Sequence, residues 1–361
     1  MMQAISADSH VTEPPELWDK YIDPKFRARA PRLERRPDTD ALIVEGLPPL
    51  LIAAFGANAG RSSDKVRQEG RFDVDVPRAG WDAAVRVAET PKDGVSGEVL
   101  YPSVGLRLYS LNDLDYKHAL FHAYNRWLAD FCATHPKQLK GVGMVALDDV
   151  ERGIDELRFI TKLGLTGAMI PINPGERPYT DPVYEPFWAA AQETGLSLSL
   201  HTHSDRRPRP DFSRTMLERT TNDTMVRQSI AAMVLGGVFQ KYPRVKALSV
   251  ENDVGWAPYF LQRMDYTFGR HMAVHGWKLD LSRTPSSYVR SNCYFTFQFD
   301  KSWVPSRYLI GVDQIMWASD YPHTDSTWPN SKTVIDGIFE DVPEHEREKI
   351  TADNARKLYG F

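Results

Sequence analysis

Short apolar runs rich in β-branched and aromatic residues alternate with longer amphipathic segments along most of the chain. Several runs, such as Gly-Ala-Met-Ile-Pro-Ile at residues 167–172, are continuously apolar, as expected for strands that are covered on both faces. This alternation predicts repeated strand–helix units around a parallel sheet. We expect eight strands, at residues 3–8, 97–102, 140–147, 166–172, 197–203, 245–251, 292–298 and 315–320. Eight such units predict an α/β fold, the closed (β/α)8 TIM barrel.

The segments between these runs have apolar residues at the three-and-four spacing of helices. Two segments end at glycines, Gly164 and Gly195, and glycine commonly caps the C-terminus of a helix. We expect helices at residues 116–134, 150–163, 186–194, 225–239, 255–268 and 343–358.

Residues 11–91 do not fit this alternation, because the stretch is far too long for a simple loop. We interpret it as an insertion after the first strand, partly helical at residues 79–90. It would cover the mouth of the barrel or contact another subunit. No internal repeat or low-complexity linker interrupts the rest, so residues 1–361 are predicted to form a single domain.

The composition narrows the range of partners and compartments. The net charge of −4 comes from 44 basic and 48 acidic residues that form no long run of one sign, which argues against nucleic acid and membrane partners. Cys132 and Cys293 are too few for a disulfide framework. The N-terminal residues lack the pattern of a signal peptide, and no run of about 18 apolar residues occurs. The sequence therefore predicts a cytoplasmic protein.

Ionisable residues follow several of the predicted strands at the end where such barrels carry their chemistry. Asp8 and His10 end the first strand and, two residues apart, point the same way. His201 and His203 end the fifth strand in the same manner. Asp320 leaves the apolar eighth strand, where a buried carboxylate needs a cation or a hydrogen-bond donor. Each residue alone is also explained as a turn cap or a structural histidine.

Together, the side chains of Asp8, His10, His201 and Asp320 offer the nitrogen and oxygen ligands that a divalent ion prefers. Three or four protein ligands leave room for a bound water, and a metal ion can lower the pKa of that water to near neutrality. The pattern therefore favours hydrolysis by a metal-bound hydroxide.

The chain also resembles the amidohydrolase-2 family of the amidohydrolase superfamily, which includes aminocarboxymuconate-semialdehyde decarboxylase and γ-resorcylate decarboxylase. The resemblance spans nearly the full length. It rests on Asp-Ser-His at residues 8–10, Glu-Pro-Phe-Trp at 185–188 leading to Leu-His at 200–201, Tyr-Pro-Arg-Val at 242–245, Ala-Ser-Asp-Tyr-Pro at 318–322 and Asp-Asn-Ala-Arg-Lys-Leu-Tyr at 353–359.

The resemblance implies that Asp8, His10, His201 and Asp320 bind the metal ion, with Asp320 also able to orient or deprotonate a metal-bound water. Zinc is the first choice, while manganese or iron would also suit two carboxylates. This sequence departs from the family's decarboxylases at Glu251, where they have a histidine. Glu251 could act as a general base, bind a second metal ion, or accept hydrogen bonds from the loop of Trp256.

Four further residues are weaker candidates. His203 is predicted as a proton shuttle, and His323, Arg206 and Trp256 as contacts to the substrate, with Arg206 suited to a carboxylate or phosphate. Each is also explained as a loop or surface residue.

Three functions compete at this point. The leading one is a metal-dependent hydrolase that acts on a small organic ester, thioester, lactone or amide. The alternative is a non-oxidative decarboxylase of an aromatic or enol carboxylic acid, and Glu251 argues against it. The third is an inactive barrel used for binding. The expected partner is a small-molecule substrate, and the chain could also form a homo-oligomer.

Overall fold

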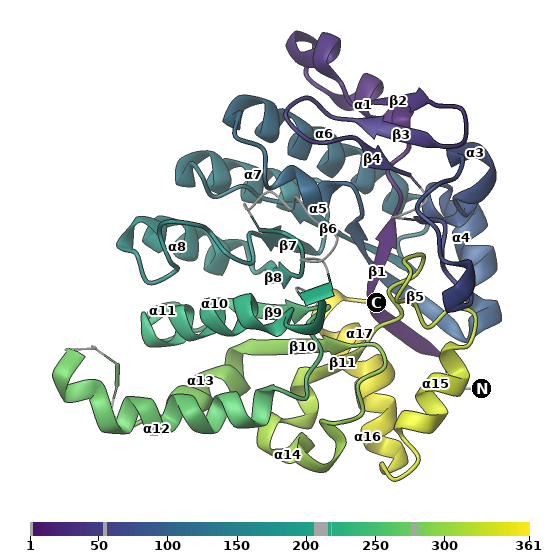
Figure 1. Ribbon diagram of the computed structural model, residues 1–361. Coiled ribbons are helices and arrows are strands. Elements are labelled where there is room, and N and C mark those ends of the chain that lie inside the picture. The colour runs from purple at the N-terminus through teal and green to yellow at the C-terminus, as the bar shows by residue number, and fades with distance from the viewer. Residues whose placement is uncertain (1–2, 53–55, 206–215, 218, 276–278, 281) are drawn as a thin grey trace.

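The computed structural model describes residues 3–52, 56–205, 216–217, 219–275, 279–280 and 282–361. Its centre is a sheet of eight parallel strands that neighbour one another in chain order (Figure 1). The strands are β1 (Ala4–Val11), β5 (Val95–Pro102), β6 (Leu139–Met144), β7 (Gly167–Ile170), β8 (Ser197–His201), β9 (Lys246–Val250), β10 (Cys293–Phe297) and β11 (Ile315–Trp317). All eight predicted strands are therefore confirmed.

Two backbone hydrogen bonds join the first strand to the segment after the last. The amide of Asp320 donates to the carbonyl of Asp8 at 2.9 Å, and the amide of His10 donates to the carbonyl of Tyr321 at 2.7 Å. We call this junction of Asp8, His10, Asp320 and Tyr321 the seam. The sheet is thus a nearly closed barrel, which confirms the predicted (β/α)8 fold.

Helices surround this sheet (Figure 1). The longer ones are α6 (Leu114–Ala133), α7 (Val150–Lys162), α8 (Glu185–Thr194), α10 (Asp223–Leu235), α12 (Ala257–His275), α13 (Pro285–Asn292) and α15 (Ser331–Ile338). Gly164 and Gly195, which follow α7 and α8, have φ angles of 76° and 71°, so both predicted caps are confirmed.

Two of the predicted helices are interrupted. The one predicted at residues 225–239 divides because Gly237 has a φ of 78°, which ends α10 before α11 (Val238–Lys241) begins. The one predicted at 343–358 consists of α16 (Glu344–Glu348), a π-helical turn at Lys349–Asp353, and α17 (Asn354–Tyr359).

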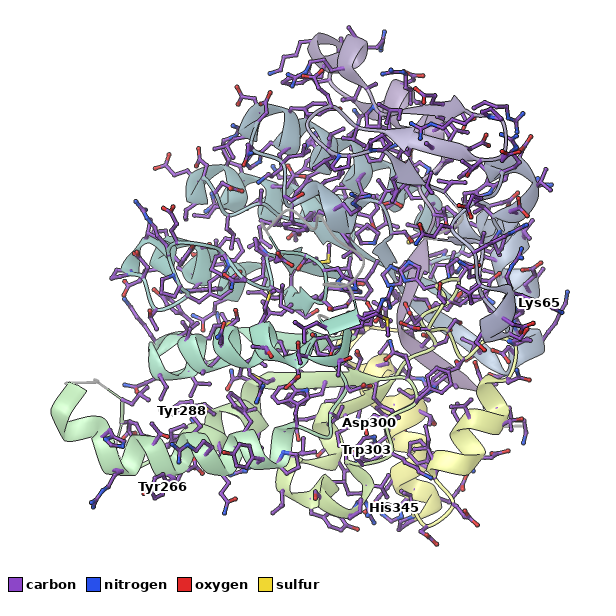
Figure 2. The ribbon with its side chains drawn as sticks, viewed as in Figure 1. Lys65, Tyr266, Tyr288, Asp300, Trp303 and His345 are labelled. Atoms are coloured by element: carbon purple, nitrogen blue, oxygen red, sulfur yellow. The ribbon has the colours of Figure 1, made fainter. Side chains whose placement is uncertain are left out.

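The interior has an apolar layer and a polar one. Trp303, labelled in Figure 2, is fully buried between β10 and the outer helices, where its ring packs against Phe297 and Phe339. Inside the barrel, by contrast, the hydroxyl of Tyr101 lies 2.9 Å from Oγ of Ser199. Apolar rings thus pack in the outer layer at Trp303, while the barrel interior contains hydrogen-bonding groups at Tyr101 and Ser199.

The stretch between β1 and β5 has secondary structure of its own. It contains α1 (Pro15–Tyr21), α3 (Phe72–Asp75), α4 (Ala83–Glu89) and an antiparallel sheet of β2 (Arg32–Arg35), β3 (Asp40–Ile43) and β4 (Leu50–Leu51). The predicted helix at residues 79–90 is mainly α4. The small sheet was not predicted, because strands of two to four residues show no readable periodicity. The expectation of one domain over residues 1–361 stays a prediction.

The structure also bears on two expectations from composition, those about membrane-spanning helices and about disulfides. Within the described residues, no helix is both long and apolar enough to cross a membrane. Cys132 and Cys293 are free and buried, so they form no disulfide.

Candidate metal centre

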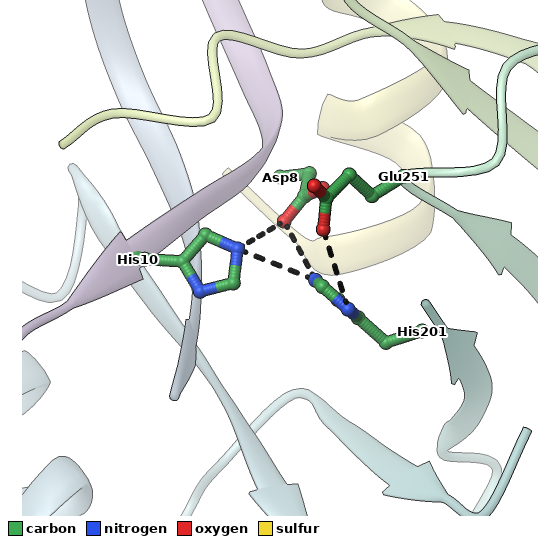
Figure 3. Close-up of side chains that lie close together, drawn as sticks. All are labelled: Asp8, His10, His201 and Glu251. Carbon is green, nitrogen blue, oxygen red and sulfur yellow. Dashed lines mark hydrogen bonds and ion pairs between the residues drawn. The ribbon is translucent and has the colours of Figure 1, made fainter. Parts of the chain in front are cut away.

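The carboxyl ends of three barrel strands bring four ionisable side chains together. Asp8 and His10 come from β1, His201 ends β8, and Glu251 follows β9; one ligand atom from each lies within 4.8 Å of the others (Figure 3). A second group shares His10 with Asp320 and His323. The structure therefore places three of the four proposed ligands, Asp8, His10 and His201, in one group with Glu251, and it places Asp320 in a second group that shares His10.

The two histidines present their Nε2 atoms to the centre of this group. Nδ1 of His10 donates to the carbonyl of Pro102 at 2.8 Å, and Nδ1 of His201 donates to the carbonyl of Thr202 at 2.7 Å. Because a carbonyl only accepts, each ring carries its hydrogen on Nδ1, so that Nε2 of the neutral ring has a free lone pair. The two Nε2 atoms lie 3.3 Å apart.

The aspartates complete this arrangement. Oδ1 of Asp8 lies 3.4 Å from Nε2 of His10 and 3.5 Å from Nε2 of His201, and Oδ1 of Asp320 lies 3.2 Å from Nε2 of His10. Both aspartates are fully buried. Among the described residues, neither oxygen of Asp8 has a hydrogen-bond partner. A buried carboxylate without donors is costly unless a cation neutralises it.

These distances fit one ion. Two ligand atoms that share an ion at about 2.0–2.2 Å lie roughly 3–3.5 Å from each other. The separations of Nε2 of His10 from Oδ1 of Asp8, Oδ1 of Asp320 and Nε2 of His201 fall in this range, and that between Nε2 of His201 and Oδ1 of Asp8 lies at its edge. The site therefore fits one divalent metal ion.

The charges of the group support this assignment. Burial raises the pKa of Asp8, but the neighbouring His201 and His10 outweigh burial and leave that pKa lowered. Burial also raises the pKa of Asp320, but His323 and His10 outweigh burial, so that this pKa is lowered as well. At His10, burial lowers the pKa, whereas Asp320 and Asp8 raise it further than burial lowers it. Both carboxylates are therefore ionised at neutral pH, and a bound cation would displace the proton that His10 attracts.

Glu251 differs from the two aspartates. Its Oε2 lies 3.7 Å from Nδ1 of His201, and its amide donates to Oγ1 of Thr296 at 3.0 Å. Burial, together with the charges of Asp320 and Asp8, raises the pKa of Glu251 well above its usual value. The carboxyl group of Glu251 is therefore harder to ionise than those of the two aspartates.

Four non-glycine residues at the strand ends have left-handed backbone. The φ angles are 69° at His203, 56° at Glu251, 54° at Asp253 and 58° at Asp320. Such residues cost on the order of 1–3 kcal/mol each and persist where the surrounding structure holds them, often at functional sites. The sequence gives no warning of this backbone, because none of the four is a glycine.

The weaker candidates lie in different places. The ring of His323 stacks on His10 at 3.8 Å between centroids, and its Nδ1 lies 3.0 Å from Oδ1 of Asp320. The indole of Trp256 donates to the carbonyls of Asn252 and Asp253, so it supports the turn after β9. His203 is partly exposed and belongs to neither group of ligand atoms. Arg206 lies outside the described residues.

Sequence reasoning missed two residues that support the site. Glu13 is buried and accepts hydrogen bonds from the amides of Ser103, Val104 and Gly105, and Oγ of Ser103 lies 2.8 Å from Nε2 of His323. The other candidates were found as ionisable residues directly at the ends of apolar runs. Glu13 lies beyond the end of the first predicted strand, and Ser103 is not ionisable, so neither residue showed this signal.

Comparison with known proteins adds a family and a reaction. A family model described as amidohydrolase, Amidohydro_2, matches residues 8–361. The 2-amino-3-carboxymuconate-6-semialdehyde decarboxylase of Dictyostelium discoideum is 24% identical over 306 residues, which cover 82% of each chain. The gamma-resorcylate decarboxylase of Rhodococcus jostii (strain RHA1) is 23% identical over 262 residues, 65% of this chain and 74% of that protein.

Solved structures resemble the whole chain. An amidohydrolase from Mycobacterium avium subsp. paratuberculosis K-10 superposes with a TM-score of 0.79 at 19% identity, over 99% of both chains. The 5-carboxyvanillate decarboxylase of Novosphingobium aromaticivorans, complexed with manganese and 4-hydroxy-3-methoxy-5-nitrobenzoic acid, has a TM-score of 0.70 at 22% identity, over 100% of this chain and 96% of that chain. At such identities these likenesses establish the fold.

The relatives correct the leading functional expectation. Both curated relatives are decarboxylases, so hydrolysis of an ester, thioester, lactone or amide is wrong as the main interpretation, and the findings support the alternative. They also bear out the prediction of an enzyme. The expectation of hydrolysis came from a ligand pattern that suits both reactions and from taking Glu251 as an argument against decarboxylation, whereas the structure raises the pKa of Glu251.

Proposed function

The chain belongs to the amidohydrolase family, whose model covers residues 8–361, and we propose that it is a metal-dependent decarboxylase that releases CO₂ from a small aromatic or enol carboxylic acid without oxidation. Two lines of support are the reactions of the two curated relatives and the aromatic acid held with manganese in a structural relative. The expected partner is accordingly a small carboxylic acid.

We assign Asp8, His10, His201 and Asp320 as the protein ligands. The observation that carries this assignment is the pair of Nε2 atoms 3.3 Å apart, each on a ring whose Nδ1 donates to a backbone carbonyl. His10 belongs to both groups of ligand atoms, which favours one shared ion over two. Zinc and manganese both suit two imidazoles and two carboxylates, and we propose one or the other. When bound, the ion would supply the positive charge that holds the carboxylate of the substrate.

Glu251 would act as the proton donor. Its buried carboxyl group, with the raised pKa, would transfer its proton to the carbon atom that bears the substrate carboxylate. The bond between that carbon and the carboxylate then breaks, its electron pair returns to the ring or enol system, and CO₂ leaves. Glu251 regains a proton from water.

His323 and Asp320 would act together in this scheme. Because His323 stacks on His10 and contacts Asp320, it would fix the orientation of two ligands rather than bind the substrate through its ring nitrogens. The predictions for His203, Arg206 and Trp256 remain predictions.

The test is product analysis with protein loaded with Mn²⁺ or Zn²⁺. The substrates are dihydroxybenzoates, carboxylated hydroxymethoxybenzoates and amino-substituted enol acids, each paired with an ester and an amide of the same skeleton. We expect metal-dependent CO₂ release from at least one acid. In D₂O the product should carry one deuterium at the carbon that lost its carboxylate. Hydrolysis of the esters or amides without CO₂ from any acid would reject the proposal.

A further inference from the structure

Arg86 is a fully buried arginine that reaches the seam from the insertion. It lies in α4, and its Nε and Nη2 donate to the two carboxylate oxygens of Glu98 in β5 at 2.7 and 2.8 Å. Nη1 also donates to the carbonyl of His10 at 2.6 Å, and Nη2 to the carbonyl of Tyr321 at 3.2 Å. One guanidinium group therefore contacts three separate segments of the barrel.

These contacts lie at the point where the barrel closes. The carbonyl of Tyr321 also accepts the amide of His10 at 2.7 Å, so Arg86 reinforces an existing link across the seam. Three of the four proposed ligands, Asp8, His10 and Asp320, belong to the two segments that meet there. The spacing between His10 and Asp320 thus depends on how tightly these segments are held together.

We propose that Arg86 and Glu98 form a positioning pair for the metal centre, through which the insertion fixes the separation of His10 and Asp320. This inference rests on the proposed metal-dependent function, and neither residue would touch the ion or the substrate. The planar guanidinium is suited to the task, because its fork of five N–H groups can bind a carboxylate with two hydrogen bonds and still reach two carbonyls.

A purely structural role predicts a different outcome. Replacing a buried ion pair by apolar residues of similar size is often neutral or stabilising, so the pair is weak evidence for stability as such. A positioning role requires metal affinity to fall even when the fold keeps its stability. Partners that orient metal ligands typically change metal affinity by about 10–100-fold when they are mutated.

The experiment uses the full-length protein and three variants. The double variant Arg86→Met with Glu98→Leu removes the pair while keeping its volume, and Arg86→Lys keeps the charge but not the fork. The control is Arg78→Lys, because Arg78 lies in the same insertion, pairs with Asp82 and is 66% exposed. The readouts are the Mn²⁺ dissociation constant from competition with a chelating dye, the electron paramagnetic resonance spectrum of bound Mn²⁺, and the urea midpoint.

We expect the metal-free double variant to keep the urea midpoint of the metal-free wild type, while its Mn²⁺ dissociation constant rises by about 10–100-fold and its resonance spectrum changes. Arg86→Lys should show a smaller rise, and Arg78→Lys none. Wild-type affinity and spectrum in a folded double variant would overturn the inference. If the double variant does not fold, unchanged affinity and spectrum in Arg86→Lys would overturn it instead. A wild type that binds neither Mn²⁺ nor Zn²⁺ would reject the proposed function, and the inference with it.

Discussion

Two fully buried aspartates, Asp40 in the insertion and Asp8 in the barrel, differ in their hydrogen-bond partners. Asp40 in β3 accepts hydrogen bonds from Nη1 of Arg71 at 2.9 Å, from Nε of Arg35 at 3.2 Å and from the amide of Phe72 at 3.0 Å. Asp8 in β1 has no hydrogen-bond partner among the described residues, and its nearest ring nitrogens lie 3.4 and 3.5 Å away.

We infer from this difference that the charge of Asp40 stabilises the fold, whereas the charge of Asp8 is suited to binding a cation. The insertion neutralises its buried aspartate with its own arginines, so Asp40 needs nothing from outside the protein. The barrel mouth leaves Asp8 without a hydrogen-bond donor among the described residues, an arrangement that costs stability unless a cation binds. We therefore expect changes in the two regions to affect different properties.

The largest effect should follow from Asp320→Asn. The amide keeps the shape of the side chain but removes a buried charge that would face the ion. We expect a roughly 10²- to 10⁴-fold fall in turnover, which corresponds to a loss of about 3–5 kcal/mol of transition-state stabilisation. Steady-state CO₂ release measures it, and circular dichroism checks the fold. The matched Asp40→Asn variant should keep wild-type turnover per folded molecule. Turnover of Asp320→Asn within about tenfold of wild type would contradict the assigned role.

The next largest effect on CO₂ release should follow from replacing Glu251. Glu251→Gln cannot donate an acidic proton, so CO₂ release should fall by roughly 10²- to 10⁴-fold. Glu251→His should retain CO₂ release, because imidazolium can also protonate carbon and the family resemblance leads us to expect a histidine at this position. The two variants are compared by product analysis on the same acid. Equal rates for Glu251→Gln and wild type would exclude Glu251 as the donor.

Metal removal should lower the free energy of unfolding through the barrel site and independently of Asp40. Dialysis against a chelator should lower the free energy of unfolding by about 2.7 kcal/mol relative to protein kept with free ion at 100 times its dissociation constant. His201→Ala, which removes one proposed ligand, should contain less metal by elemental analysis and respond less to the chelator in urea unfolding. Asp40→Asn should respond as the wild type does. An unchanged chelator effect in His201→Ala would place the ion elsewhere.

The smallest effect concerns Asp40 itself. Asp40→Asn should lower the free energy of unfolding by about 1.5–3 kcal/mol at neutral pH, the usual range for hydrogen bonds to a charged group. Burial raises the pKa of Asp40, but the amide of Phe72 and the two arginines outweigh burial, so the folded pKa is lowered. Its contribution is therefore complete above the unfolded pKa of about 3.9 and is lost as the pH falls through the lower folded value. Urea unfolding between pH 6 and 3 should show the wild type and the variant converging at the acid end. A constant difference would argue against a charge effect.

The barrel was predictable because of its strands. Continuous apolar runs identify strands that are covered on both faces, and ionisable residues directly after them marked Asp8, His10, His201 and Asp320. The sheet of β2, β3 and β4 was not predictable, because the four residues of β2 include three charged ones and give no alternation that differs from a loop.

The reaction was harder to predict than the site. The same four ligand-type residues suit hydrolysis and decarboxylation, and in the proposed scheme the choice depends on Glu251 as a proton donor. The raised pKa of Glu251 comes from its burial and from the charges of Asp320 and Asp8, which no local pattern encodes. Arg86 was missed for a related reason, since its contacts are with the carbonyls of His10 and Tyr321, far from it in the chain.

The seam also has a consequence for biosynthesis. During translation, Asp8 and His10 leave the ribosome long before Asp320, and His201 emerges between them. A growing chain can therefore offer only part of the proposed ligand set, and a partial set holds a divalent ion weakly. With the proposed ligands, tight binding of the metal would wait until β11 docks against β1. The ion would then be taken from the metals available around the folded barrel rather than around the emerging first strand.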